Sequence, residues 1–213
     1  MQTAIKICGI SSVEALDACI DARADFFGMV FFPLSPRHVD SHAASSLAMR
    51  AGSRIGRVGL FVDADDGAIG DAVKAGRLDA IQLHGSESPA RSAQIKSRFN
   101  LPVWKAIAVS TSSDVAQADN YHDAVDLILF DAKTPKDAAL PGGMGLKFDW
   151  SLLESWRGRP GWGLAGGLTP RNVAQALSET RAPLVDTSSG VETSLGLKDP
   201  ARIAAFCAAA RKA

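Results

Sequence analysis

The stretch Ala4–Ile10, AIKICGI, is the first apolar run of the sequence, and its pattern recurs along the rest of the chain. Isoleucine alternates with other residues and a glycine lies near the end, so the stretch predicts a β-strand. Ser11 and Ser12 can cap a helix that begins at Val13. Cys8 therefore lies where the strand passes into a loop. Ligands of α/β proteins bind at these carboxyl ends of parallel strands, which makes Cys8 a candidate site residue.

The same order of strand and helix continues to the end of the chain. Strands are predicted near residues 4–10, 26–32, 55–62, 78–83, 103–109, 125–130, 161–164 and 184–186, each followed by a helix. The fifth helix is predicted to run to Tyr121, and the sixth is short and opens at Asp149. Alternating strands and helices predict a parallel sheet of the α/β class, and eight such units predict a (β/α)8 TIM barrel.

We expect residues 1–213 to form this barrel as a single domain, because no linker or change in composition divides the chain. The structural alternative is an open, doubly wound sheet. It fits less well, since no Gly-x-Gly-x-x-Gly motif follows the first strand and no switch point is evident.

The charges of the chain balance, with 23 lysine and arginine residues against 23 aspartate and glutamate residues. Nucleic-acid and membrane-surface partners both favour a basic patch or helix, so we expect neither. Three cysteines, an odd number, favour reduced cytoplasmic surroundings. The chain starts directly with a strand, which predicts no signal peptide, and its longest apolar run, Phe26–Leu34, is too short for a membrane span. We expect a cytoplasmic protein, monomeric or homodimeric, whose partner is a small molecule.

The two loops after the last two strands predict a phosphate site. Gly166 and Gly167 follow the seventh strand, and Ser188, Ser189 and Gly190 follow the eighth. Barrels often hold a phosphate between these loops, where glycine lets the backbone N–H groups approach the anion and serine adds hydroxyl donors. The alternative is that the glycines make a tight turn and the serines cap a helix.

Three residues at strand ends are candidates for acid–base chemistry. As a thiolate, Cys8 would be a competent base or nucleophile. It can equally be a buried small hydrophobe, as Cys19 and Cys207 are expected to be on the apolar faces of helices. Asp131 ends an apolar run, where a carboxyl group serves either as a general acid at the barrel mouth or as a helix cap. Asp186, at the end of the eighth strand, has the same two interpretations.

Four further residues carry open alternatives. Arg37 lies in a loop between prolines, where it either clamps a substrate carboxylate or is simply exposed. His84 is either a substrate ligand or a loop histidine with a local partner. Lys6 and Lys105 lie within predicted strands, where a lysine can form a Schiff base with a carbonyl substrate. No spacing along the chain is typical of a zinc or calcium site, so we expect no metal.

Together, the segments at the strand ends resemble the phosphoribosylanthranilate isomerases of tryptophan biosynthesis. The resemblance runs the whole chain, and the ordered set is specific although each motif alone is weak. The motifs are residues 6–10 (KICGI), 35–37 (SPR), 82–85 (QLHG), 130–132 (FDA), 142–145 (GGMG), 148–150 (FDW), 164–168 (LAGGL) and 186–192 (DTSSGVE).

This resemblance implies an Amadori rearrangement of N-(5-phosphoribosyl)anthranilate to 1-(2-carboxyphenylamino)-1-deoxyribulose 5-phosphate, without a cofactor. Asp131 matches the family's general acid, which protonates the ribose ring oxygen, and Cys8 matches the general base, which removes the proton from the second sugar carbon. Arg37 matches the residue that binds the anthranilate carboxylate, and Asp186 the one beside the anthranilate nitrogen. The glycines and serines after the last two strands match the family's phosphate site. The QLHG motif makes His84 a candidate substrate-binding residue.

Three positions depart from the family's usual pattern: Met144 replaces a threonine, Asp63 an asparagine and Leu195 a proline. None of them removes a group assigned to proton transfer. The rival interpretations are another phosphate-binding barrel, such as an indole-glycerol-phosphate synthase or an aldolase that forms a Schiff base on Lys6 or Lys105, and a phosphosugar-binding barrel without catalysis.

Overall fold

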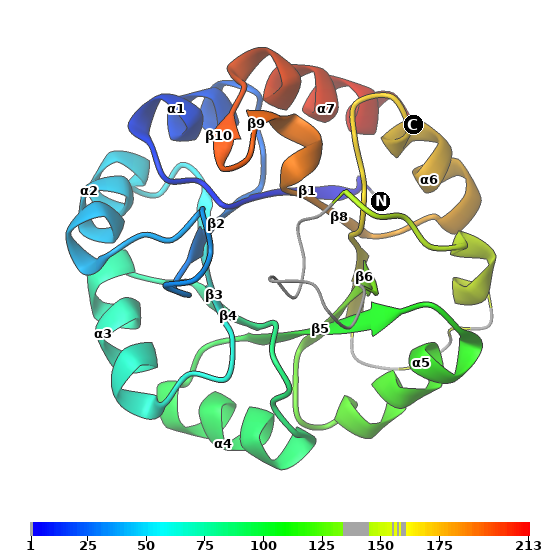
Figure 1. Ribbon diagram of the computed structural model, residues 1–213, viewed down its shortest axis with the longest axis horizontal. Helices are drawn as coiled ribbons and strands as arrows, with labels where there is room; N and C mark the ends of the chain where they lie inside the picture. Colours follow the sequence, from blue (N-terminus) through cyan, green and yellow to red (C-terminus); the bar gives the residue numbers. More distant parts are fainter. Residues whose placement is uncertain (1, 134–144, 155, 157, 159–160) are drawn as a thin grey trace.

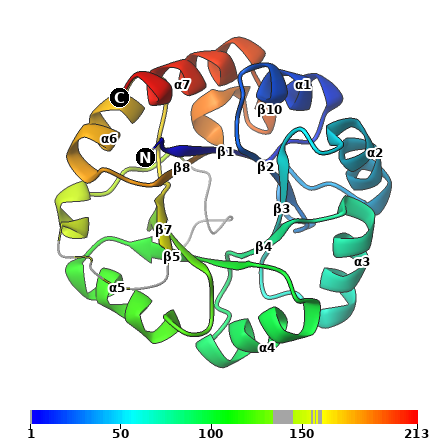
Figure 2. The same cartoon turned by 180° about the vertical axis from the view of Figure 1, so that it is seen from behind.

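A computed structural model describes residues 2–133, 145–154, 156, 158 and 161–213 of the chain. Eight strands form a closed barrel in the order β1 to β8, and the helices surround it (Figure 1, and from behind Figure 2). Strand β1 pairs in parallel with both β2 and β8, which closes the sheet on itself. The expectation of a (β/α)8 barrel is therefore confirmed, and an open doubly wound sheet is excluded.

The barrel strands begin and end within a few residues of the predicted limits. The barrel strands are β1 (Ala4–Cys8), β2 (Phe26–Val30), β3 (Gly56–Phe61), β4 (Ala80–Leu83), β5 (Val103–Val109), β6 (Leu127–Ala132), β7 (Gly161–Leu164) and β8 (Leu184–Thr187). The helices are α1 (Val13–Asp21), α2 (Ser41–Ala51), α3 (Asp66–Gly76), α4 (Pro89–Phe99), α5 (Ser112–Ala116), α6 (Val173–Thr180) and α7 (Pro200–Lys212). None of these described helices is long and apolar enough to cross a membrane.

Two of the predicted helical segments contain 3₁₀ helix. The fifth ends at Tyr121 as predicted, but α5 gives way to a 3₁₀ helix at Gln117–Tyr121. This segment contains Asp119 and Asn120, whose short polar side chains favour caps and turns over helix interiors. After β6, the short helix predicted to open at Asp149 is a 3₁₀ helix at Trp150–Leu153, with Asp149 as its N-cap.

A short hairpin that the sequence did not predict follows β8. It consists of β9 (Glu192–Ser194) and β10 (Leu197–Lys198), paired antiparallel. The strands have only three residues and two residues, too few for alternation to be recognisable. Figure 1 shows the hairpin between α1 and α7, above the barrel end where β1 and β8 meet.

Alternation along each strand decides which side chains enter the barrel. On β1, Ile5 and Ile7 point outward and join the large core under the helices, whereas Cys8 belongs to a separate small cluster. The interior of the barrel is filled at one level by Val58, Trp104, Leu129 and other apolar side chains. On each strand, the next side chain that points into the barrel comes two residues later and lies nearer the carboxyl end of the strand. This is the level at which the polar side chains gather.

Candidate active site

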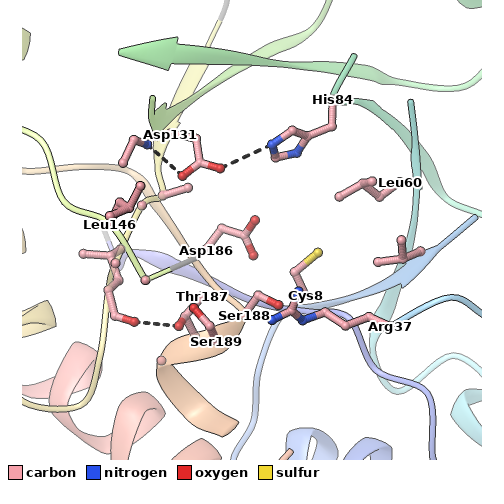
Figure 3. A pocket seen from close by; sticks show the side chains of 18 of the residues that line it. Cys8, Arg37, Leu60, His84, Asp131, Leu146, Asp186, Thr187, Ser188 and Ser189 are labelled. Atoms are coloured by element: carbon pink, nitrogen blue, oxygen red, sulfur yellow. Dashed lines mark hydrogen bonds and ion pairs between the residues drawn. The ribbon is translucent and has the colours of Figure 1, made fainter. Parts of the chain in front are cut away.

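A pocket opens at the carboxyl ends of the barrel strands (Figure 3). The space inside it, counted out to its open mouth, is about 800 Å³. All ten candidate site residues line it, although they come from strand ends and loops spread over the whole chain. They are Cys8, Arg37, His84, Asp131, Gly166, Gly167, Asp186, Ser188, Ser189 and Gly190.

The Cys8 side chain projects into the pocket from the end of β1 (Figure 3). It lies beside Gly28 of β2, where a Cβ atom would come within 2.9 Å of the Cys8 sulfur and 3.2 Å of the Lys6 Nζ. The glycine therefore leaves room for both side chains. Burial raises the pKa of the Cys8 thiol above its usual value, and the Lys6 ammonium only partly opposes this shift. Cys19 and Cys207 are free thiols on the buried faces of α1 and α7, as expected.

Asp131 lies across the pocket from Cys8, at the end of β6 (Figure 3). One carboxylate oxygen, Oδ1, accepts a hydrogen bond from the backbone N–H of Ala132 at 2.8 Å. The other, Oδ2, lies 3.3 Å from Nε2 of His84. His84 in turn has its Nδ1 atom 3.2 Å from Nε2 of Gln82. Asp131 is thus held at both oxygens, and one of its partners can carry a proton.

Asp186 enters the pocket from β8, and its Oδ2 forms an ion pair with Nζ of Lys6 at 2.9 Å. The pairing follows from the barrel's closure, since Lys6 and Asp186 are register partners in β1 and β8. Burial alone would lower the pKa of Lys6, but Asp186 and Cys8 outweigh it and the net shift is upward. Lys6 is therefore an ammonium group. A Schiff base requires a neutral amine, so this lysine is poorly suited to aldolase chemistry.

Lys105 is also paired with neighbouring groups of the protein. Its Nζ donates hydrogen bonds to the carboxylate of Glu87 at 2.9 Å and to the carbonyl of Gly85 at 2.6 Å. Neither Lys105 nor Lys6 lines the pocket formed by the described residues. The geometry thus gives no support to a Schiff base on either lysine.

Arg37 is buried rather than exposed, and its side chain is held by Glu192 of the β9–β10 hairpin. Nε and Nη2 of Arg37 donate to the two carboxylate oxygens of Glu192 at 2.7 and 2.8 Å. Nζ of Lys198 donates to the same carboxylate at 2.6 Å, and to the backbone carbonyl and Oγ of Ser188 at 3.0 and 3.1 Å. The pKa of Glu192 falls to about 2, because Arg37 and Lys198 outweigh the effect of burial.

Two cations thus surround one anion beside the pocket, which leaves a net positive charge where Arg37 lines the wall. A carboxylate of a ligand would be attracted to this wall. Lys198 connects the Arg37 side of the pocket to Ser188, one of the residues expected to hold a phosphate.

The loops after β7 and β8 come together at the pocket wall, with Ser188 next to Arg37 (Figure 3). Gly166 and Gly167 have φ values of +83° and +60°, which side chains rarely tolerate. The hydroxyl of Thr187 donates to the carbonyl of Leu168 at 2.7 Å and ties the two loops together. Gly190 packs so closely on the same carbonyl that a Cβ atom would collide with it. Within the described residues, the backbone N–H groups of Gly166 and Gly167 have no protein acceptor, so they are available to an anion.

A model of the N-(5'-phosphoribosyl)anthranilate (PRA) isomerase family matches residues 5–209. The chain belongs to this family. The N-(5'-phosphoribosyl)anthranilate isomerase of Paracoccus denitrificans (strain Pd 1222) is 50% identical over 210 residues, covering 99% of this chain and 98% of that relative.

Solved structures of the family agree with this membership. The monomers generated from the dimeric phosphoribosylanthranilate isomerase of Thermotoga maritima match with a TM-score of 0.86 and 35% identity, over the full length of both chains. A phosphoribosylanthranilate isomerase in complex with reduced 1-(o-carboxyphenylamino)-1-deoxyribulose 5-phosphate matches with a TM-score of 0.87 and 34% identity, also over both full lengths. The fold and the arrangement of strands are therefore those of the isomerase family.

Two of the three departures from the family's pattern can be placed. Asp63 has a left-handed backbone, with φ of +49°, which a short polar side chain tolerates. Its Oδ1 accepts hydrogen bonds from the N–H and hydroxyl of Ser86 at 2.8 and 2.9 Å, so it braces the neighbouring loop outside the pocket. Leu195 is exposed in the hairpin turn between β9 and β10. Met144 lies outside the described residues.

The sequence missed three residues that matter for the site's geometry. Glu192 and Lys198 hold Arg37 and Ser188, and Gln82 contacts His84. Glu192 and Gln82 fall within the motifs that carry the family resemblance, but nothing local in the sequence identifies their partners. No group of three or more metal-ligating side chains suited to an ion occurs within the described parts of the chain.

Proposed function

We propose that this chain catalyses the Amadori rearrangement of N-(5'-phosphoribosyl)anthranilate, the isomerisation of the family to which it belongs, as a step of tryptophan biosynthesis. The observation that carries the proposal is the pocket itself. A carboxyl group, a thiol, a buried arginine and two glycine-containing loops converge there from opposite walls (Figure 3). These are the groups needed to move two protons on a ligand that is anionic at both ends.

The reaction begins with protonation of the ribose ring oxygen by Asp131. The bond between this oxygen and the first sugar carbon breaks, and the anthranilate nitrogen supplies the electron pair that forms a Schiff base. Cys8, as thiolate, then removes the proton from the second sugar carbon and gives an enolamine. Tautomerisation to the ketone completes the aldose-to-ketose conversion. Asp131 and Cys8 lie on opposite sides of the pocket, so each approaches a different part of the substrate (Figure 3).

The anionic ends of the substrate define its orientation. The phosphate binds at Gly166, Gly167, Ser188, Ser189 and Gly190. The anthranilate carboxylate lies at Arg37, and Asp186 lies beside the anthranilate nitrogen, where its Oδ1 atom has no partner among the described residues. A buried acceptor of this kind fits an N–H donor.

Turnover of the substrate tests this function directly. Phosphoribosylanthranilate is generated in place from anthranilate and phosphoribosyl pyrophosphate by a separate transferase, and its fluorescence decay is followed with and without the protein. We expect enzyme-dependent decay, beyond spontaneous hydrolysis, that yields the deoxyribulose product. Decay at the background rate would contradict the proposed function. Binding of a product analogue without turnover would identify a phosphosugar-binding barrel instead.

Replacing Arg37 with alanine should raise KM about tenfold to a hundredfold with a smaller effect on kcat, because a charge-assisted contact to the substrate is lost. The measurement is the concentration dependence of turnover. Arg50 provides the matched control: it also forms a two-bond pair with a carboxylate, Asp17, but it is exposed on α2. Arg50→Ala should leave both constants unchanged. An unchanged KM in folded Arg37→Ala would count against the carboxylate clamp.

The assembly of the protein is a separate proposal. We propose a monomer or homodimer, which light scattering on the purified chain would check. A larger assembly would contradict it.

A further inference from the structure

Gln82 lies behind the histidine that contacts Asp131. It is fully buried on β4, lines the pocket, and its amide nitrogen is 3.2 Å from Nδ1 of His84. Nε2 of the same ring is 3.3 Å from Oδ2 of Asp131 (Figure 3). The three side chains therefore form a line that starts in the barrel wall and ends at the carboxylate.

The chemistry of the amide decides which hydrogen faces Asp131. An amide nitrogen only donates hydrogen bonds, so the Nδ1 atom beside it must be the acceptor. The single hydrogen of the neutral imidazole then lies on Nε2 and points toward Asp131. With the amide reversed, its oxygen would require a hydrogen on Nδ1, and Nε2 would turn a lone pair toward Asp131.

Little else among the described residues holds the amide. Its oxygen, Oε1, is buried and has no hydrogen-bond partner in the described structure, and the contact with His84 is the one hydrogen bond of the amide among the described residues. The other ionisable groups near His84 and Asp131 come from β8 and β1, which do not pair with β4 or β6. Asp186 of β8 faces them and is paired with Lys6 of β1, and the Cys8 thiol lies beside Lys6. None of these groups contacts Nδ1 of His84.

We propose that Gln82 is a positioning residue that fixes His84 in the tautomer with its hydrogen on Nε2. The catalytic consequence rests on the proposed function, in which Asp131 gives its proton to the ribose ring oxygen. The Asp131 carboxylate left behind then receives the hydrogen bond from Nε2 of His84. A lone pair at that position would repel the new carboxylate.

Nitrogen NMR of histidine-labelled protein tests the tautomer without substrate. The chain has four histidines, and His84→Gln identifies the signals of His84. In the unmodified protein we expect Nδ1 without a proton and Nε2 with one. In Gln82→Glu, which has nearly the same shape but only accepts, we expect a proton on Nδ1. Gln82→Met keeps the length without hydrogen bonding and should lose the restraint, so that the ring signals broaden or divide.

Kinetics then connect the tautomer to the reaction. Gln82→Glu should lower kcat about tenfold or more and leave KM within about twofold, because the lost contact strengthens only after proton transfer. A proton on Nδ1 in the unmodified protein, or unchanged His84 signals in Gln82→Glu, would overturn the inference. A rise in KM alone would overturn it too, by making Gln82 a substrate ligand. If Gln82→Glu does not fold, the spectra of the unmodified protein and of Gln82→Met decide the matter.

The two proposals fail separately. Absence of turnover, or normal turnover in Asp131→Asn, would remove the acid role assigned to Asp131 while the NMR result on His84 stood. If the protein catalyses the expected reaction but NMR shows the His84 hydrogen on Nδ1, only the role of Gln82 is removed.

Discussion

Replacing Asp131 with asparagine should lower kcat about 100-fold or more, the usual scale for loss of a general acid. An amide has no acidic proton to give to the ribose ring oxygen, so the ring can no longer open with assistance. Asparagine has the same shape as aspartate. Its amide oxygen can still accept the hydrogen bond that the Ala132 N–H donates to Oδ1 of Asp131, at 2.8 Å, in the unmodified protein. KM should therefore change much less than kcat. The measurement is the initial rate of fluorescence decay at saturating substrate.

Asp63→Asn is the matched control for this change. Asp63 also follows a barrel strand, but it lies outside the pocket and contacts Ser86. Asparagine can make the same acceptor contact and tolerates the left-handed backbone at this position. This variant should keep normal turnover. Near-normal turnover in Asp131→Asn would contradict the assignment of Asp131 as the general acid.

The barrel and the position of its site could be predicted because they depend on local patterns. Alternation and strand-to-helix periodicity locate the strands, and parallel strands in a closed barrel all end at one face. A barrel of eight strands therefore predicts that Cys8, Asp131 and Asp186 lie at the same end. The glycines after β7 and β8 were recognisable for the same reason, since their place in the chain fixes their place in the fold.

The partners of the charged residues could not be predicted, because they depend on contacts between distant parts of the chain. Lys6 meets Asp186 only because β8 closes against β1, a pairing across 180 positions. Arg37 meets Glu192 across 155 positions, through a hairpin too short to be recognised. From the sequence, Lys6 in a strand resembles a Schiff-base lysine, and only its ion pair with a buried carboxylate distinguishes it.

Replacing Cys8 with alanine should also lower kcat about 100-fold or more, because no base remains to take the proton from the second sugar carbon. Cys8→Ser should be nearly as slow, since a serine hydroxyl does not ionise near neutral pH. Cys207→Ala is the control: it removes another buried thiol, on α7 and away from the pocket, and should keep its kcat. Normal turnover in folded Cys8→Ala would contradict the role of Cys8 as base.

The surroundings of Cys8 predict how its thiol titrates. Burial raises the pKa of Cys8, and the ammonium groups of Lys6 and Lys198 oppose this while Asp186 reinforces it. Since only the thiolate reacts with iodoacetamide, the rate of Cys8 alkylation in the free protein should reach half its maximum above about pH 8.5, the ordinary thiol value. Peptide mapping separates Cys8 from Cys19 and Cys207, which lie on α1 and α7. A midpoint below the ordinary value would mean that the two lysines outweigh burial, and that the base is ionised before substrate arrives. A midpoint above it means that the thiol of the resting enzyme is protonated and must release this proton before Cys8, as thiolate, can take the proton from carbon.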